Sequence, residues 1–344
     1  MRYAILDLGT NTFNLLIIET ETEKERKVLL SRKEPVKLGE GGISQGKISD
    51  KAFSRGIKAI ENHMKYIKDY RVGQIHAYAT SAIRSAGNGL EFVRTVYQKF
   101  NIGIQVITGE REAELIYHGV KQVVDMGDNK HLILDIGGGS NELIIADSKT
   151  IFWKKSFPLG MARLLERFRP SDPITSDDID ALEGYFEKSL RCFFDAASEH
   201  NPLVLVGSSG SFDTIRALLT AMKKEESVAD IPDADLSLPD KKHGSPSPNG
   251  PGTPDPFSTD YLQPLYIIKP EDFTKLYNRL IESTSKERLN MEGMDPMRVE
   301  MIVIAAIFIN FIVHKLNIVM MVQSDYSLKE GAVLEILDHQ ILSA

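Results

Sequence analysis

Two short segments of the sequence share one pattern, in which an apolar run ends in aspartate and a turn of glycine and small polar residues follows. The first is Asp7-Leu8-Gly9-Thr10-Asn11-Thr12, and the second is Asp135-Ile136-Gly137-Gly138-Gly139-Ser140. Another apolar run follows each turn, at residues 14–19 and 141–146, so each segment is predicted to be a β-hairpin. Because each half opens with the same hairpin, the chain is predicted to repeat one architecture without repeating one sequence.

The length of the chain also favours two domains. At 344 residues it is about twice the span of a usual single domain, and a hydrophobic content of 42% is enough for two buried cores. We expect an N-terminal domain over residues 1–124 and a C-terminal domain over residues 125–344. Between about 223 and 263 the sequence is rich in Pro, Gly, Ser and Asp, which predicts a flexible surface insertion in the second domain.

Hydrophobic periodicity predicts a mixed α/β fold for the first domain. After Ser49, a predicted N-cap, apolar residues recur at three- and four-residue steps, as on the buried face of a helix. These residues are Phe53, Ile57, Ile60, Met64 and Ile67. Further strands are predicted at residues 74–79 and 105–107, and further helices at 90–100 and 112–124.

The second domain is predicted to mix strands and helices in the same way. A strand is expected at residues 151–155, followed by a helix capped near Ser176 with Ile179, Leu182, Phe186, Leu190 and Phe193 on its apolar face. Beyond a strand at 203–206 and the insertion, helices are expected at 270–283 and 296–314, and a strand at 318–323. A closing helix from Leu328 is expected to pack back on the first domain.

Composition and charge limit the classes of function. A single cysteine, Cys192, excludes a disulfide framework, and no leader pattern stands at the N-terminus, so we expect a reducing, cytoplasmic setting. The longest apolar run, residues 301–313, contains Asn310 and is shorter than the ~20 residues of a membrane span, which predicts a buried helix and no membrane partner. A net charge of -7 disfavours nucleic acid as a partner, although a local basic groove for another polyanion is compatible with it.

The two glycine-rich turns are candidate phosphate-binding loops. A phosphate chain offers charge and no apolar surface, so its site needs backbone amides, cations and a metal ion. Glycine lets the backbone approach, which makes Gly9, Thr10, Asn11 and Thr12, and likewise Gly137, Gly138, Gly139 and Ser140, candidate phosphate ligands. Asp7, Asp135 and Glu142 could supply oxygen ligands for Mg²⁺ or Mn²⁺. Two alternatives stay open: the turns are purely structural, and each Asp caps its own turn.

Six segments of the chain match one known family in the order in which the family has them. They are residues 5–12, 37–41, 79–84, 107–113, 134–142 and 156–160. With them, nearly the whole chain outside the proline-rich segment resembles the exopolyphosphatase/guanosine pentaphosphate phosphatase (Ppx/GppA) family. The resemblance implies two actin-like domains, as in sugar kinases, Hsp70 and actin, each with a ribonuclease H-like fold. It also implies that the active site lies in the cleft between the two domains. It also implies a homodimer.

The resemblance assigns roles that residue patterns alone do not. It makes Glu112 the catalytic base that deprotonates the attacking water, and it makes Ser81 and Arg84 phosphate ligands, since a guanidinium can clamp two phosphate oxygens. Without it, Glu112 would be interpreted as a capping or helix-dipole residue, and Arg84 equally well as part of a surface ion pair.

Several positions depart from the pattern of that family. Arg111 stands where the family usually has Glu, and Glu300 where it has Asp. Ser209 lies in Gly207-Ser208-Ser209-Gly210-Ser211, where the family loop reads Gly-Thr-Gly-Gly-Thr, and Ser327 and Lys329 stand for Gly and Arg. The expected function is release of terminal phosphate from inorganic polyphosphate or guanosine pentaphosphate. The alternatives are a non-catalytic binder of either molecule and an ATP-dependent kinase of the same fold.

Overall fold

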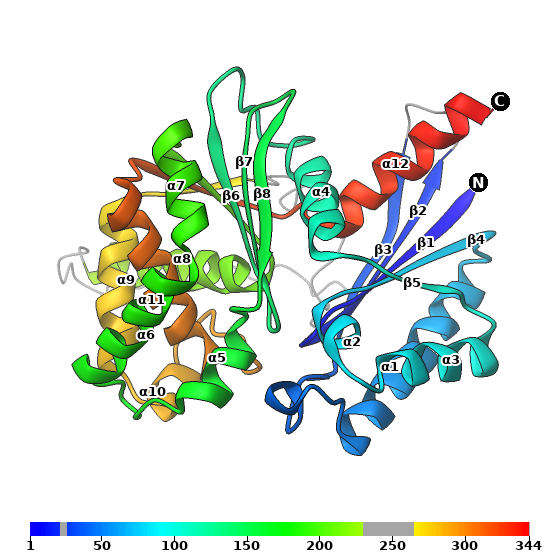
Figure 1. The fold of residues 1–344 in the computed structure, drawn as a ribbon, viewed down its shortest axis with the longest axis horizontal. Helices are drawn as coiled ribbons and strands as arrows, with labels where there is room; N and C mark the ends of the chain where they lie inside the picture. The colour runs from blue at the N-terminus through cyan, green and yellow to red at the C-terminus, as the bar shows by residue number, and fades with distance from the viewer. Residues whose placement is uncertain (21–25, 230–264, 344) are drawn as a thin grey trace, which may run out of the picture.

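The N-terminal hairpin forms the centre of the first of two β-sheets in the computed structural model, which describes residues 1–20, 26–229 and 265–343 (Figure 1). Strand β1 (Arg2–Leu8) pairs antiparallel with β2 (Thr12–Thr20), and β2 pairs antiparallel with β3 (Arg26–Pro35). On the other side of β1, β4 (Gln74–Ala79) and β5 (Ile104–Val106) run parallel to it. The strand order is therefore β3-β2-β1-β4-β5.

The second hairpin occupies the same place in the second sheet. Its strands, in the order β10-β11-β9-β6-β7-β8, are β6 (His131–Ile136), β7 (Asn141–Ala146), β8 (Ile151–Phe157), β9 (Val204–Ser208), β10 (Leu265–Ile268) and β11 (Met320–Ser324). As in the first sheet, three strands form an antiparallel meander and the next two run parallel to the first of them. Apart from the edge strand β10, the two sheets have one plan, which confirms the predicted repetition of architecture.

Two helices from distant parts of the chain lie between the sheets. These are α4 (Gly109–Val120) and α12 (Leu328–Ser343), which pack together in the middle of Figure 1. Alternation along β1 explains how both faces of the first sheet are covered: Tyr3 and Ile5 pack toward α4 and α12, whereas Ala4 and Leu6 pack toward the outer helices. The central position of α4 places its first turn at the junction of the two halves.

The remaining helices cover the outer faces of the sheets. On the first sheet they are α1 (Asp50–Asp69), α2 (Ser81–Ser85) and α3 (Gly89–Phe100). On the second they are α5 (Met161–Phe168), α6 (Ser176–Ser189), α7 (Arg191–His200), α8 (Gly210–Ala229), α9 (Pro270–Glu282), α10 (Ser285–Leu289) and α11 (Met301–Leu316). Helix α11 is buried around its circumference, as its apolar sequence predicted, although it begins at Met301 rather than at 296. Among the described residues, no helix is both long and apolar enough to cross a membrane.

The predicted helix after residue 176 is two helices. Thr175, and not Ser176, is the N-cap of α6: its side chain accepts a hydrogen bond from the Asp178 amide, and the Asp178 side chain completes a capping box. Leu190, with φ -101° and ψ 11°, leaves the helical region and separates α6 from α7. Because Leu182, Phe186, Leu190 and Phe193 are all fully buried, the apolar pattern runs through the break and did not reveal it.

The predicted start of the insertion, at 223, is also wrong. Helix α8 continues through this point to Ala229, and its charged last turns are paired with α9. Lys223 pairs with Asp272 at 3.0 Å, Glu225 with Arg279 at 3.0 Å, and Glu226 with Lys275 at 3.1 Å. Ion pairs with α9 therefore stabilise the charged end of α8, and the composition of residues 223–229 alone could not indicate these pairs. The rest of the predicted insertion, residues 230–263, lies outside the described residues.

Strand β3, which carries several charged side chains, was not predicted. It is an edge strand, and edge strands commonly carry such charges. Helices α2, α5, α8 and α10 and strand β10 were also not predicted. Apart from the divided helix after residue 176, the predicted elements, including the hairpins, β4 and α1 with its Ser49 cap, are confirmed to within a few residues.

Candidate active site

The two glycine-rich turns have the same internal hydrogen bond. The Gly9 amide donates to the Thr12 carbonyl at 3.0 Å, and the Gly137 amide donates to the Ser140 carbonyl at 3.1 Å. The turns also meet. A Cβ atom placed on Gly138 would lie 2.5 Å from the Asn11 amide nitrogen, and one on Gly139 would lie 2.7 Å from the Thr10 hydroxyl. The two hairpin tips are therefore in close contact, and a larger residue at Gly138 or Gly139 would displace the side chains of Asn11 or Thr10.

The start of α5 holds the second loop in place. The amides of Met161 and Ala162 donate at 2.9 Å to the carbonyls of Gly137 and Gly138, and the Arg163 side chain donates to the Gly139 carbonyl at 3.2 Å. The carbonyls of this loop are therefore hydrogen-bonded to α5. Its amides can point the other way, toward a ligand. The backbone of Gly160 packs directly on the same loop.

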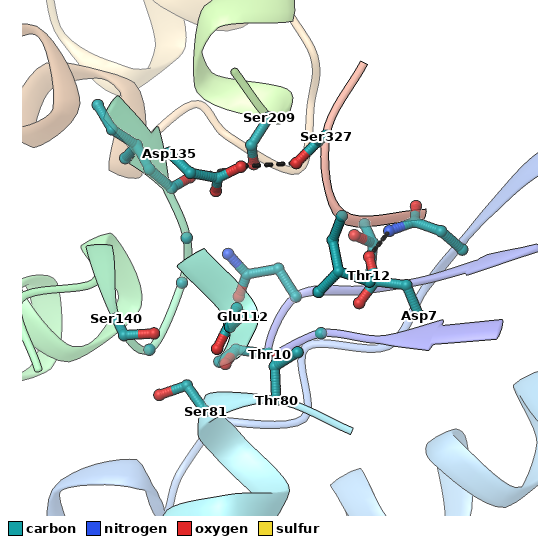
Figure 2. A pocket seen from close by; sticks show the side chains of 18 of the residues that line it. Asp7, Thr10, Thr12, Thr80, Ser81, Glu112, Asp135, Ser140, Ser209 and Ser327 are labelled. Carbon is teal, nitrogen blue, oxygen red and sulfur yellow. Dashed lines mark hydrogen bonds between the residues drawn. The ribbon is translucent and has the colours of Figure 1, made fainter. Parts of the chain in front are cut away.

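The two loops line one narrow cleft of about 90 Å³ between the halves of the molecule. Figure 2 shows the side chains that converge on it: Glu112 at the centre, Asp7 and Asp135 on opposite sides, Thr10 and Ser81 below, and Ser140 on the left. Every predicted phosphate ligand except Arg84 lines this cleft. Arg84 lines an adjoining hollow that shares Ser81 and Ser140 with the cleft.

Glu112 stands in the first turn of α4, but it does not cap the helix. The N-cap is Thr108, whose side chain accepts from the Arg111 amide at 3.1 Å. The Glu112 carboxylate is only 10% exposed and accepts a hydrogen bond of 2.7 Å from Arg84. Burial raises the pKa of Glu112 to about 7, against the lowering effect of Arg84, and Asp135 and Asp7 add to the rise. A carboxyl with this pKa can accept a proton near neutral pH.

Asp7 and Asp135 do not cap their own turns. Asp7 accepts a hydrogen bond of 2.8 Å from Asn14, its cross-strand neighbour, and Asp135 accepts from Ser208 and Ser327, which come from distant segments. Burial raises the pKa of Asp7 to about 6, and it also raises the pKa of Asp135. The charge of Asp135 raises the pKa of Asp7 further. Two desolvated carboxyls on one cleft form an arrangement that a cation would stabilise.

Glu142 lies behind the cleft wall. Its carboxylate accepts hydrogen bonds from Ser140 at 2.8 Å and from Ser156 at 2.6 Å, and it is 1% exposed. Burial, together with the charges of Glu112 and Asp135, raises its pKa well above the usual value. In the described part of the chain no three His, Cys, Asp or Glu side chains gather as a metal site. Since Mg²⁺ is commonly held by one or two carboxylates and substrate phosphates, Asp7 and Asp135 fit it and Glu142 does not.

Five further polar residues line the cleft that were not among the predicted ligands: Asn14, Thr80, Ser209, Arg298 and Ser327. Arg298 is the most notable, because its side chain is only 13% exposed and has one ion-pair partner among the described residues, Asp295, at 3.4 Å. It comes from the turn before α11, and nothing local marks it as a ligand. One sequence feature could have identified these residues. The segments around 209, 298 and 327 all depart from the family pattern, and all three reach the same cleft.

The cleft opens into two larger hollows of different character. One begins at Ser81 and Ser140 and is lined by the cations Arg84, Lys155 and Arg163 against one carboxylate, Glu110. The other begins at Asn11 and has two cations, Lys37 and Arg169, against three carboxylates, Glu40, Glu166 and Glu300. Apolar side chains, namely Leu165, Met297 and Met301, also line the second hollow. The first hollow suits a polyanion better.

Two α/β halves with the same strand arrangement, with paired glycine-rich loops facing a shared cleft, define an actin-like fold. Comparison with known proteins then identifies the family. The model of the Ppx/GppA phosphatase family matches residues 17–340, and the chain belongs to this family. The resemblance noted from the six sequence segments is thereby confirmed.

Solved structures agree with this assignment. An exopolyphosphatase from Cytophaga hutchinsonii is 34% identical, with a TM-score of 0.85 and 98% of each chain covered. The Aquifex aeolicus member of the Ppx/GppA family is 22% identical, with a TM-score of 0.72 and 98% of each chain covered. An exopolyphosphatase-like protein is 22% identical, with a TM-score of 0.78 over 99% of this chain and all of the other. The last two show the fold alone.

Proposed function

We propose that this protein hydrolyses the terminal phosphoanhydride bond of inorganic polyphosphate in the cleft between its two halves. The observation that carries the proposal is the convergence of two phosphate-type loops, two aspartates and the buried Glu112 on one cleft. Family membership and the 34% identical exopolyphosphatase support it.

The residues divide the reaction between them. Amides of the loops around Gly9 and Gly137 bind the terminal phosphoryl oxygens, which orients the phosphorus for in-line attack. Glu112 accepts the proton of the attacking water as the new P–O bond forms and the bond to the chain oxygen breaks. Asp7 and Asp135 would hold Mg²⁺, which would neutralise phosphate charge. The products are orthophosphate and a chain shorter by one unit.

The charge of the two hollows supports polyphosphate as the first candidate substrate. A polyphosphate chain carries about one negative charge per unit, so its remainder fits the hollow of Arg84, Lys155 and Arg163, with three cations and one carboxylate. Guanosine pentaphosphate is the second candidate, because Leu165, Met297 and Met301 give the other hollow an apolar wall for a base.

Phosphate release from long-chain polyphosphate, tripolyphosphate and guanosine pentaphosphate, with Mg²⁺ or EDTA, tests the proposal. We expect Mg²⁺-dependent release from polyphosphate. Lys155→Ala, in the basic hollow, is expected to raise KM for long chains about tenfold, the effect of one lost charged contact, and to affect tripolyphosphate less. Lys149→Ala is the matched control, since Lys149 pairs with Asp128 and is 74% exposed.

The remaining outcomes of these assays would favour other functions. Release from guanosine pentaphosphate alone favours the second substrate. Binding of either molecule without release favours a non-catalytic binder, and ATP consumption that depends on an added acceptor favours a kinase. An equal KM for long chains in Lys155→Ala and the native protein contradicts the assigned hollow.

The pH dependence of release should follow the ionisation of Glu112. Glu112 acts as a base only when charged, so activity is expected to rise with pH through about 7. The charge and hydrogen bond of Arg84 lower this pKa, so Arg84→Gln should shift the rising limb to higher pH. Arg279→Gln, which breaks a surface pair with Glu225, is the control and should leave the limb in place. An unmoved limb in Arg84→Gln would show that another group controls the profile.

A further inference from the structure

The Asp135 carboxylate is surrounded by serines from separate segments. The Ser208 hydroxyl, at the end of β9, donates to Oδ2 at 2.6 Å, and the Ser327 hydroxyl, just before α12, donates to the same oxygen at 2.8 Å. Figure 2 shows Ser327 bonded to Asp135, with Ser209 beside them. Ser208 and Asp135 are also paired in register between β9 and β6.

Ser209 occupies a backbone conformation that disfavours a side chain. Its φ is 75°, in the left-handed region where glycine is the usual residue. Its hydroxyl donates to the Ile136 carbonyl at 3.3 Å, and the Ser209 side chain lies beside Asp135 (Figure 2). A strained position that places a hydroxyl beside a buried carboxyl indicates a function for the hydroxyl.

Asp135 and Glu112 differ in the charge of the groups that donate hydrogen bonds to their carboxylates. Glu112 has a charged partner, Arg84, at 2.7 Å, which would repel a metal cation nearby. The hydrogen bonds of Asp135 come from neutral hydroxyls. Hydroxyl donors stabilise an ionised carboxylate without cancelling its charge, so that charge stays available to a cation. Because Ser208 and Ser327 both donate to Oδ2, they also fix the orientation of the carboxylate and leave Oδ1 for a ligand.

We propose that Ser208, Ser209 and Ser327 form a hydroxyl collar that orients Asp135 as a ligand of a divalent cation. They are positioning residues, since they act through Asp135. The identification of the cation as Mg²⁺ rests on the proposed function, whereas the collar rests on the contacts themselves. Partners of metal ligands typically contribute 10- to 100-fold to metal affinity, which sets the expected effect at about this size.

Titration with Mn²⁺, followed by electron paramagnetic resonance of the full-length protein, tests the collar without a reaction. Ser208→Ala and Ser327→Gly are each expected to weaken Mn²⁺ binding by about 10- to 100-fold. Ser211→Ala is the matched control, because Ser211 is buried in the same loop region but does not donate to Asp135 in the described structure. It should bind Mn²⁺ as the native protein does.

Ser209→Gly gives the sharpest result, because two readouts should move in opposite directions. Glycine relieves the left-handed backbone, so the thermal unfolding temperature should rise, while loss of the hydroxyl should weaken Mn²⁺ binding. A merely structural serine would not lower the affinity for the metal.

Equal Mn²⁺ affinity in the native protein and all three collar variants, or no Mn²⁺ binding by the native protein, overturns the collar. The proposed function is judged separately by phosphate release. If polyphosphate is hydrolysed while the variants bind Mn²⁺ normally, only the collar is wrong. If the variants lose Mn²⁺ affinity but the native protein releases no phosphate, the collar stands and the function is wrong.

Discussion

Glu112→Gln is expected to lower kcat for phosphate release by about 10²- to 10⁴-fold, the contribution usual for a general base. Glutamine keeps the size of the side chain and can still accept a hydrogen bond from Arg84, but it cannot take a proton from water. Because the phosphate-binding loops are untouched, KM for polyphosphate should change little. Initial rates with Mg²⁺ and saturating polyphosphate measure the effect.

Glu114→Gln is the control for this result. Glu114 lies on the same helix and is ion-paired with Arg111 at 3.1 Å and with Lys154, away from the cleft. Its replacement should leave kcat within about twofold of native, as for a partly exposed ion pair away from the reacting atoms. If both variants release phosphate at the native rate, Glu112 is not the base.

The stability of Glu112→Gln offers an independent check on the environment of this residue. The pKa of Glu112 is raised from 4.5 to about 7, so the native protein should lose stability as pH rises through this interval, where the unfolded chain is already ionised. A neutral glutamine removes that dependence. Thermal unfolding at pH 5 and pH 8 should therefore show a smaller decrease for the variant than for the native chain.

Local features of the fold could be predicted from the sequence. Both hairpins were predicted, because the two strands and the glycine-rich turn of a hairpin are consecutive in the sequence. Asp7 and Asp135 are the penultimate residues of the first strands of these hairpins, next to the glycine-rich turns. Their position on the cleft therefore followed once the two halves were known to face each other. The role proposed for Glu112 needed the family resemblance, because a glutamate in the first turn of a helix usually stabilises the helix itself.

The partners of the site residues could not be predicted, because they come from far along the chain. Ser208 and Ser327 are 73 and 192 residues from Asp135, and no periodicity connects such positions. Glu142 shows the opposite problem. It is paired in register with Asp135, so a cross-strand argument places the two carboxyls on one face. Ser140 and Ser156 cover Glu142, and only the packed structure shows this.

Gly160→Ala is expected to have the second large effect, because Gly160 packs on the loop of residues 137–140 from another part of the chain. A Cβ on Gly160 would lie 2.3 Å from the Gly139 nitrogen and 2.4 Å from the carbonyl carbons of Gly138 and Gly139. These contacts are with backbone, so no side chain can rotate away, and the loop of residues 137–140 must move. Since a displacement of about 1 Å can cost 10²-fold in rate, kcat/KM for polyphosphate should fall by about this factor or more.

Gly184→Ala is the matched control, because it makes the same change where the structure has room. Gly184 lies inside α6, and a Cβ there would meet nothing within 4 Å. Alanine is a better helix former than glycine by roughly 0.5–1 kcal/mol, so this variant should unfold at a higher temperature with native kcat/KM. Circular dichroism should show Gly160→Ala to be folded. If that folded variant kept native kcat/KM, the position of the second loop would not limit catalysis, and the role proposed for its amides would have to be abandoned.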